Sequence, residues 1–184
     1  MGSEISVLVP LAEGFEELEA ITIIDLLRRA GIRVVVAGLS EGSIRASHNT
    51  VHLADMTLDE ALQQDYEMVV LPGGLPGANH LNADPRIHKL IQQMAAEGKY
   101  TAAICAAPKV LADAGVLSGI EATSYPGFLQ GTAATVIEDA DVVTDGKIIT
   151  SRGPGTAMDF ALELIEALLG AEARSEVETP LVRG

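Results

Sequence analysis

A chain of 184 residues, of which 48% are hydrophobic and 21% charged, is long and apolar enough to fold as one domain (residues 1–184) around a sizeable core. Its 26 acidic residues outnumber the 12 basic ones and give a formal net charge of −14, which excludes nucleic acid as the expected main partner. The N-terminus lacks a signal-like pattern, no apolar run approaches the roughly 20 residues of a membrane span, and a single cysteine cannot form an internal disulfide. We therefore expect a cytoplasmic protein with no membrane partner.

Short apolar runs typical of buried parallel strands alternate with helical patterns along the chain. These runs are Ile5–Pro10, Val34–Leu39, Met68–Leu71 and Thr101–Ile104. This alternation predicts an α/β fold with a mostly parallel sheet and helices on both faces. The opening residues MGSEIS match a myristoylation pattern, but a core strand is expected to begin directly after them, so lipidation is not expected.

Helix boundaries are marked by capping residues in the first half of the chain. Thr57 and Glu60 have the spacing of a capping box. Asp84 before Pro85 combines an N-cap residue with proline at the first helical position. The helix that follows keeps one apolar face, and Gly98 is expected to end it.

Two antiparallel excursions are predicted beside the parallel strands. Asp145-Gly146 between VVT and KIIT is a two-residue hairpin signature, and a second hairpin is expected at 43–53. The final helix is expected after Thr156, with a polar tail from Gly170.

The only cysteine, Cys105, lies where a strand ending at Ile104 meets a helix expected to begin near Ala106. Free N–H groups at a helix N-terminus favour a thiolate and can lower a cysteine pKa from about 8.5 to roughly 3.5–7.5. This position therefore suits a nucleophile. A buried, inert cysteine in an alanine-rich strand end is the alternative that the segment alone leaves open.

A glycine-rich loop follows the strand that ends at Leu71. Its backbone N–H groups in LPGGLPG are free to approach a ligand or a developing anion. A simple strand-to-helix turn explains the same glycines equally well. The loop lacks the spacings of the dinucleotide and P-loop motifs, so no nucleotide cofactor is expected.

Three carboxylates, Glu16, Glu17 and Glu19, lie where the chain enters its first helix. Glu19 precedes Ile23 by four residues and therefore follows the core-facing stripe, where a half-buried carboxyl would have a raised pKa and could exchange protons with a cysteine. Periodicity does not separate Glu19 from Glu16. Because the carboxyl ends of parallel strands share one edge of the sheet, we expect this loop, the glycine loop and the cysteine to meet there.

The four histidines carry no recognisable metal-binding motif. His48 and His52 lie in the second predicted hairpin, His80 follows the glycine loop, and His88 lies on a half-exposed helix. None is spaced from a second ligand as metal sites usually require. Surface roles are expected, and no metal or other cofactor is indicated.

Taken together, the segments GFEELEA, IDLLRRAGI, VVLPGG, AAICAAP and TSRGPGTAMDFAL resemble the DJ-1/PfpI (ThiJ) superfamily, most closely its DJ-1 and YajL-like branch. The resemblance implies a flavodoxin-like three-layer α/β sandwich and a homodimer. It implies that Cys105 is an oxidation-prone nucleophile and that Glu19 hydrogen-bonds its sulfur. It also assigns the backbone N–H groups of Gly74 and Ala106 to an anion pocket.

The chain departs from the family pattern at three positions. Protease-like members carry a histidine after the cysteine, whereas Ala106 stands here and disfavours peptide hydrolysis. Tyr125, before Pro126, replaces a histidine of many relatives, and tyrosine is a poor base near neutral pH. His48 replaces an arginine near the dimer-side pocket. The expected substrate pocket consists of Gly73, Tyr125, Pro126 and His48.

The resemblance favours an enzyme that protects against reactive aldehydes. Cys105 would attack a small α-oxoaldehyde such as methylglyoxal, and Glu19 would help rearrange the hemithioacetal to a hydroxy acid, as in a glyoxalase or deglycase. A redox sensor or stress chaperone whose cysteine is oxidised to a sulfinate is the second hypothesis. A structural domain with a silent cysteine is the third.

Overall fold

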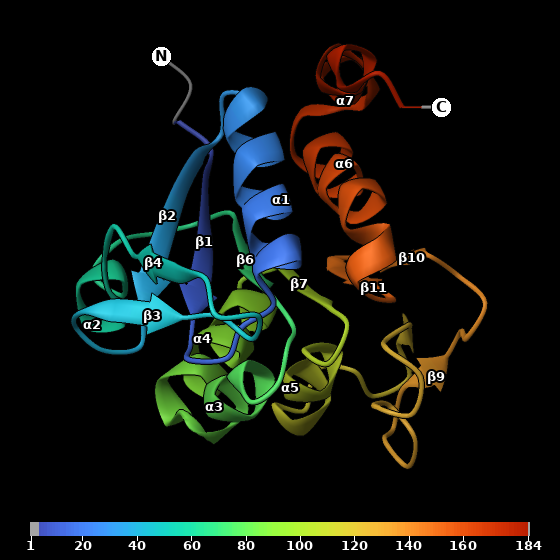
Figure 1. The fold of residues 1–184 in the computed structure, drawn as a ribbon. Coiled ribbons are helices and arrows are strands. Elements are labelled where there is room, and N and C mark those ends of the chain that lie inside the picture. Colours follow the sequence, from blue (N-terminus) through green and yellow to red (C-terminus); the bar gives the residue numbers. More distant parts are fainter. Residues whose placement is uncertain (1–3, 184) are drawn as a thin grey trace.

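The computed structural model describes residues 4–183, and a seven-stranded sheet lies at its centre (Figure 1). The strand order is β10-β11-β7-β6-β1-β2-β5. All neighbours pair in parallel except β10 and β11, which are antiparallel. The strands are β1 (Ser6–Leu11), β2 (Arg33–Gly38), β5 (Met56–Thr57), β6 (Met68–Leu71), β7 (Tyr100–Ile104), β10 (Val142–Asp145) and β11 (Ile148–Ser151). The predicted, mostly parallel sheet is confirmed.

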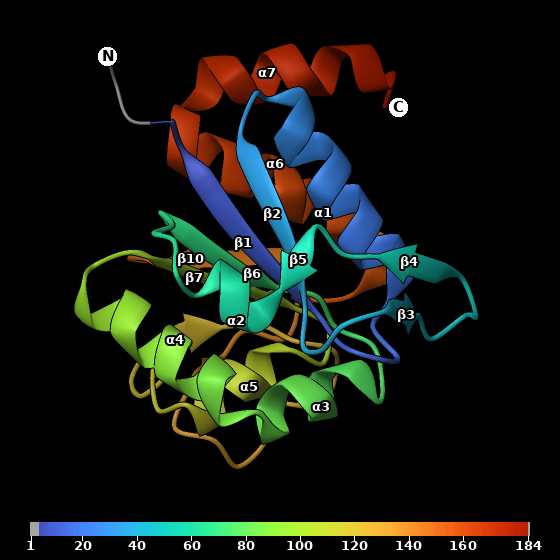
Figure 2. The same ribbon diagram turned by 90° about the vertical axis from the view of Figure 1, so that its left-hand side faces the viewer.

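Helices cover both faces of this sheet and make three layers (Figure 2). One layer contains α1 (Glu17–Arg29), α6 (Ala157–Leu169) and α7 (Ala171–Glu178). The opposite layer contains α2 (Leu58–Ala61), α3 (Gly77–Ala83), α4 (Pro85–Ala96) and α5 (Pro108–Asp113). Along β1, Val7 and Val9 pack in the first core and Leu8 in the second. Burial on both faces explains why the strands read as continuous apolar runs, and the expected α/β sandwich is confirmed.

Both antiparallel excursions are present. Asp145 and Ile148 pair at the end of the β10–β11 hairpin, with Gly146 at a φ of 59°. The second hairpin pairs β3 (Ser43–Arg45) with β4 (Val51–Leu53). A further two-stranded sheet of β8 (Glu121–Ala122) and β9 (Thr135–Val136), which pair in parallel, had no signal in the sequence.

The predicted caps form as the residue types require. The Thr57 side chain accepts from the Glu60 N–H while Glu60 accepts from the Thr57 N–H, which completes the capping box at α2. Asp84 accepts from the Arg86 N–H at 2.9 Å, and Pro85 is the first residue of α4. Gly98, with a φ of 69°, follows the end of that helix.

The helix after the cysteine begins later than predicted. Residues 105–107 form a turn, in which the Ala107 N–H donates to the Ile104 carbonyl, and α5 starts at Pro108. Proline has no N–H to donate and its fixed φ suits the first helical position, so the helix starts there. The expected start near Ala106 is therefore wrong by two residues.

The expected polar tail from Gly170 is also wrong, because α7 and a short 3-10 helix, η2 (Thr179–Leu181), occupy this part of the chain. Gly170 has a φ of 92° and turns the chain between α6 and α7. Val177 is buried against the α1–α6 layer. Arg174 makes ion pairs with Glu163 and Glu166 of α6. One buried valine in a charged segment is too weak a pattern to predict such a helix.

The myristoylation-like start includes Gly2, which lies outside the described residues. Within residues 4–183, the helices lack the combination of length and apolar composition that crossing a membrane requires.

Candidate active site

Five chain segments meet at the carboxyl edge of the sheet, as the strand order predicts. The Glu16 N–H donates to the Gly73 carbonyl at 2.9 Å, which joins the loop after β1 to the glycine loop after β6. The Cys105 N–H donates to the Ser151 carbonyl at 3.0 Å, and the Tyr125 N–H donates to the Cys105 carbonyl at 2.8 Å. These bonds tie the cysteine to β11 and to the segment after β8. The predicted convergence of the three loops is thereby present.

Cys105 has a strained backbone conformation. Its φ of 64° lies in the left-handed region, which residues other than glycine seldom adopt. The strand β7 ends immediately before it, and the turn that leads to α5 follows. The half-buried side chain is consequently held at a sharp strand-to-helix turn, where such strain is characteristic of functional residues.

The environment of the sulfur raises its pKa. Burial raises the pKa of the Cys105 thiol to about 12, and the negative charge of Glu19 acts in the same direction. The nearby backbone N–H groups of Gly74 and Ala106 oppose this shift. The expected lowering of the thiol pKa is therefore wrong, because two donors in a loop and a turn do not compensate for burial beside a carboxyl group.

Glu19 is the buried partner of the thiol. Its side chain is fully buried, and its Oε1 accepts from the Gly73 N–H at 3.0 Å. Burial raises the pKa of Glu19 to about 8, while the Gly73 N–H and the Cys105 thiol lower it. Glu16 instead caps α1 by accepting from the Leu18 N–H. The structure thus separates the two carboxylates that periodicity left equivalent, and the expected rise of a carboxyl pKa belongs to Glu19.

The glycines beside this pair leave no room for side chains. A Cβ on Gly73 would lie 2.7 Å from the Cys105 Cβ and 2.8 Å from the Glu19 Oε1. A Cβ on Gly74, whose φ is 88°, would lie 2.3 Å from the Glu16 nitrogen. Glycine at these two positions is what allows backbone N–H groups to approach the sulfur and the carboxyl.

We expect Gly73→Ala to separate Cys105 from Glu19, because the new methyl group would overlap both. The free energy of unfolding should fall by about 2 kcal/mol, the usual range for overpacking. Urea unfolding together with the rate of Cys105 alkylation measures both effects. Gly155→Ala is the matched control, since a Cβ there meets nothing within 4 Å. Equal losses of stability in the two variants would contradict the close packing at Gly73.

Tyr125 and Pro126 lie beside a cavity of about 330 Å³. Tyr125 is 49% exposed and packs edge-on against Phe128 with ring centroids 6.2 Å apart. The remaining lining residues come from the end of the sheet and the turn after β11: Asp141, Arg152, Gly153, Pro154, Gly155 and Thr156. Cys105 is a backbone neighbour of Tyr125 but does not line this cavity.

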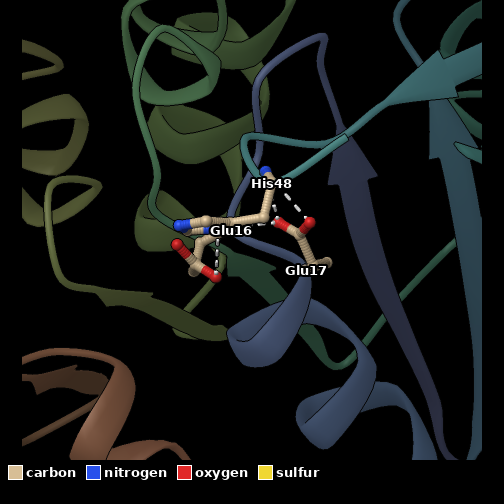
Figure 3. A group of neighbouring side chains, drawn as sticks. All are labelled: Glu16, Glu17 and His48. Atoms are coloured by element: carbon tan, nitrogen blue, oxygen red, sulfur yellow. Dashed lines mark hydrogen bonds and ion pairs between the residues drawn. The ribbon is translucent and has the colours of Figure 1, made fainter. Parts of the chain in front are cut away.

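His48 joins Glu16 and Glu17 in a cluster that no local pattern predicts, because 31 residues separate His48 from Glu17 (Figure 3). Its Nδ1 lies 3.4 Å from oxygens of both Glu16 and Glu17. Burial alone would raise the pKa of Glu17, but hydrogen bonds from the backbone and from Thr50 and Ser47 lower it to about 2. The three side chains present ligand atoms within 4.8 Å of one another, and these atoms already make hydrogen bonds or ion pairs within the protein. We treat them as a charge cluster.

The other three histidines have local partners. His52 packs edge-on against Phe15 with ring centroids 5.3 Å apart. His80 Nδ1 lies 2.9 Å from the Glu13 carbonyl, and His88 Nε2 lies 2.8 Å from the Asn82 side-chain oxygen. These contacts suit the surface roles expected for them.

The fold and the site define a class of α/β sandwich proteins with one cysteine on a strained turn at the carboxyl edge of the sheet and a buried carboxyl beside it. Residues 5–167 match the DJ-1/PfpI family, and the chain belongs to that family. It is 44% identical over 180 residues to Protein dj-1beta of Drosophila melanogaster, covering 96% of each chain. The crystal structure of that protein superposes with a TM-score of 0.94 over 98% of this chain and 99% of the other.

Two further relatives bear on function. The glutathione-independent glyoxalase DJR-1.2 of Caenorhabditis elegans is 32% identical over 184 residues, with 98% of each chain covered. A structure of oxidized DJ-1 from Toxoplasma gondii is 37% identical and has a TM-score of 0.93, covering 98% of this chain and 99% of that one. The family therefore includes a protein named as a glyoxalase and one whose structure is described as oxidized.

Proposed function

We propose that this protein is a cofactor-independent glyoxalase, or a deglycase of the same thiol chemistry, that converts methylglyoxal to lactate. The observation that carries the proposal is the enclosed pair of Cys105 and Glu19 with the N–H groups of Gly74 and Ala106 at the sulfur. Addition to an aldehyde needs a nucleophile, a proton acceptor and donors for the developing oxyanion. The name of the Caenorhabditis elegans relative supports the same reaction.

The reaction begins with the thiol proton. Glu19, as a carboxylate, takes the proton of Cys105, and the thiolate adds to the aldehyde carbon of methylglyoxal. The carbonyl electron pair moves to oxygen, where the N–H groups of Gly74 and Ala106 stabilise it until Glu19 returns the proton. The product of this step is a hemithioacetal at Cys105.

Glu19 then serves a second time. Its carboxylate removes the hydrogen of the former aldehyde carbon as a proton, the electrons form an enediolate with the neighbouring carbonyl, and Glu19 returns the proton to the neighbouring carbon. The hydroxyl proton on the former aldehyde carbon passes to the neighbouring oxygen, so that the former aldehyde carbon becomes the carbonyl. This transfer leaves a thioester of lactate on Cys105. Water hydrolyses the thioester to lactate and restores the thiol, so the balance is one methylglyoxal and one water consumed for each lactate formed.

The pKa values predict slow turnover at neutral pH. With Glu19 near 8 and Cys105 near 12, the pair holds both protons in most molecules at pH 7. The reactive form has lost one proton and becomes more abundant as the pH rises. Tyr125, a member of the expected substrate pocket, is 49% exposed and can donate a hydrogen bond, but no imidazole stands in its place.

The experiment that tests the proposal is a stereospecific assay of lactate from methylglyoxal in phosphate buffer at pH 8, where Glu19 is half deprotonated. Lactate formed in proportion to protein, and abolished by prior alkylation of Cys105, supports a glyoxalase. Lactate at the rate of the buffer alone would overturn it.

The second candidate is a redox sensor or stress chaperone, favoured by the half-buried, single cysteine and by the oxidized relative. Two molecules of peroxide would convert the thiolate to a sulfinate and release two waters. The Gly74 and Ala106 N–H groups would stabilise its negative charge. Mass spectrometry after mild peroxide tests this role: a stable gain of two oxygens on Cys105 supports it, and an unmodified cysteine rejects it.

We also propose that the protein is cytoplasmic, since a reactive thiol persists in a reducing compartment. We propose further that it forms a homodimer. Four large apolar side chains on α1 and β4 are exposed, namely Leu18 (53%), Ile21 (43%), Val51 (50%) and Leu53 (79%). The two elements are neighbours because Glu17 binds the turn of the β3–β4 hairpin. Apolar side chains gathered in this way are typical of a surface that a second copy covers.

Leu53→Asp is expected to favour monomers, because it would place a charge in this apolar surface. Sedimentation equilibrium should show a dissociation constant raised by about 100-fold, the loss of about 2.7 kcal/mol of association free energy. Val182→Asp is the control, since Val182 is 87% exposed and lies at the other end of the chain. A Leu53→Asp protein that stays dimeric at the same concentrations would place the interface elsewhere.

A further inference from the structure

We propose that the cavity beside Tyr125 is an anion subsite, in which the Arg152 guanidinium and the Tyr125 hydroxyl bind a carboxylate of the substrate. The preferred substrates are then α-oxoaldehydes that carry a carboxylate, with the aldehyde at Cys105 and the carboxylate at Arg152. This substrate class rests on the proposed function. Ligand binding, which is measured without turnover, tests the subsite separately from the reaction.

Arg152 differs from the other arginines of the chain in having no partner for its guanidinium within residues 4–183. The others each make a hydrogen bond or an ion pair through that group: Arg28, Arg29, Arg33, Arg45, Arg86, Arg174 and Arg183. The Arg152 side chain is nevertheless half-buried, in a chain whose formal net charge is −14. A cation that has lost part of its water and gained no acceptor from the protein is unfavourable, and an anionic ligand supplies the missing acceptor.

The cavity brings this guanidinium together with a second donor. Arg152 and Tyr125 both line the cavity of about 330 Å³. The Tyr125 ring lies beside the residue that follows Arg152, since a Cβ on Gly153 would lie 3.5 Å from the Tyr125 Cδ2. In the part of the chain that the structure describes, the Tyr125 hydroxyl makes no hydrogen bond. A guanidinium binds a carboxylate through two parallel N–H donors, and the hydroxyl offers a third.

The same cavity adjoins the cysteine through the backbone. The Tyr125 N–H donates to the Cys105 carbonyl at 2.8 Å, and the Cys105 N–H donates to the carbonyl of Ser151 at 3.0 Å. Ser151 immediately precedes Arg152, so both donor residues are anchored next to the turn that holds the thiol. A short substrate with its carboxylate in the cavity can therefore direct its other end toward the sulfur.

The acidic residues nearby limit the charge of the ligand. Asp141 lines the same cavity, and Glu138 and Asp139 line a neighbouring one of about 270 Å³ that shares Pro126 and Arg152. Among residues 4–183, none of these three carboxylates forms an ion pair with Arg152. They would repel a second negative charge on the ligand, so a singly charged carboxylate suits the subsite better than a phosphate dianion.

The compound 4,5-dioxopentanoate represents this substrate class, because it is methylglyoxal with a –CH2–COO⁻ group on its methyl carbon. The Cys105 thiolate would add to its aldehyde carbon, and Glu19 would move the hydrogen of that carbon, as a proton, to the neighbouring carbon. Water then hydrolyses the thioester and restores the thiol. One 4,5-dioxopentanoate and one water give one 2-hydroxyglutarate, with no oxidant or reductant.

The first experiment is an NMR titration of the unmodified protein with 4-oxopentanoate, which has the same carbon chain but no aldehyde to react with the thiol. Pentan-2-one is the uncharged probe of the same length. Arg152→Gln is expected to weaken 4-oxopentanoate binding by about tenfold or more, as is usual for a lost hydrogen bond to a charged group. Arg152→Lys should weaken it by about threefold, because lysine keeps the charge but not the planar pair of donors. Lys89→Gln is the matched control, since it removes one positive charge from an exposed position on α4 outside this cavity.

Equal affinities of the Arg152→Gln and Lys89→Gln proteins for 4-oxopentanoate would overturn the subsite, as would equal binding of pentan-2-one and 4-oxopentanoate by the unmodified protein. Inorganic phosphate is the third probe, and tighter binding of phosphate than of 4-oxopentanoate would overturn the assignment to a carboxylate.

The second experiment compares kcat/KM for 4,5-dioxopentanoate and for methylglyoxal. The ratio is expected to be about tenfold in favour of 4,5-dioxopentanoate in the unmodified protein and close to one in Arg152→Gln. Binding of 4-oxopentanoate that depends on Arg152, without turnover of either aldehyde, would remove the glyoxalase and leave the subsite standing. Turnover of both aldehydes at a ratio that Arg152→Gln does not change would remove the subsite and leave the glyoxalase standing.

Discussion

Cys105→Ala is expected to reduce lactate formation from methylglyoxal by about 10³-fold or more, to near the rate of buffer. Every step of the proposed reaction passes through a carbon–sulfur bond, and the chain has no second cysteine to replace the nucleophile. The measurement is initial rate against protein concentration at pH 8. Turnover within tenfold of the unmodified protein would remove Cys105 from the reaction and leave the carboxyl of Glu19 as the group to investigate.

The control for this variant is structural. Cys105 has a φ of 64°, and alanine has the same difficulty as cysteine in this region, so the backbone strain is unchanged by the substitution. The thermal midpoint should therefore stay close to that of the unmodified protein. A large fall in the midpoint would mean that lost activity reflects lost packing, and Cys105→Ser, which keeps a polar atom near the N–H groups of Gly74 and Ala106, would then be the variant to compare.

Glu19→Gln is expected to lower turnover by about 10²-fold, within the usual range for removing a general acid or base. The amide has the size of the carboxyl and still offers an oxygen to the Gly73 N–H, so packing around Cys105 is preserved. It cannot take the thiol proton. The rate of the unmodified protein should rise with pH around an apparent pKa of about 8, and this rise should be lost in the variant. A variant that retained the rise would show that another group accepts the proton.

The same substitution should change how stability depends on pH. The pKa of Glu19 is about 8 in the folded protein and about 4.5 in the unfolded chain. Between these pH values the folded protein therefore keeps a proton that the unfolded chain loses. The stabilising contribution is complete below pH 4.5 and disappears as the pH rises through 8. Glu19→Gln should match the unmodified protein at pH 4 and exceed its free energy of unfolding by about 5 kcal/mol at pH 8.5. Parallel pH profiles of urea unfolding in the two proteins would contradict a buried neutral carboxyl.

Local signals sufficed for most of the fold. The apolar run at 68–71 is β6 without change, and Asp84 before Pro85 marks the start of α4. Asp145-Gly146 specifies its hairpin because glycine readily adopts the positive φ that the turn requires. Such features depend on residues within a few positions of one another. The weakest prediction, the tail from Gly170, failed because α7 is stabilised by ion pairs and one buried valine rather than by a strong apolar face.

Which residues meet at the candidate site could be predicted better than the direction of their pKa shifts. Family resemblance and the position of Glu19 on the core stripe placed it beside Cys105, and the structure joins it to Gly73. The direction of the thiol pKa was wrong, because burial and the neighbouring carboxyl depend on how the loops close over the sulfur. The contact of His48 with Glu16 depends on how a hairpin packs on a helix, which has no signature within either segment.

The reactive pair is assembled from loops far apart in the chain, and this has a consequence for folding. Glu19 and Gly73 are separated by 54 residues, and the strand before Cys105 pairs on both sides with strands that come earlier and later in the chain. Contacts of such long range are late and slow to form. Until β11 has docked beside β7, the thiol is that of an open chain and has a pKa of about 8.5. Newly made molecules would thus be more easily alkylated than finished ones, and completion of the sheet is what shields the sulfur.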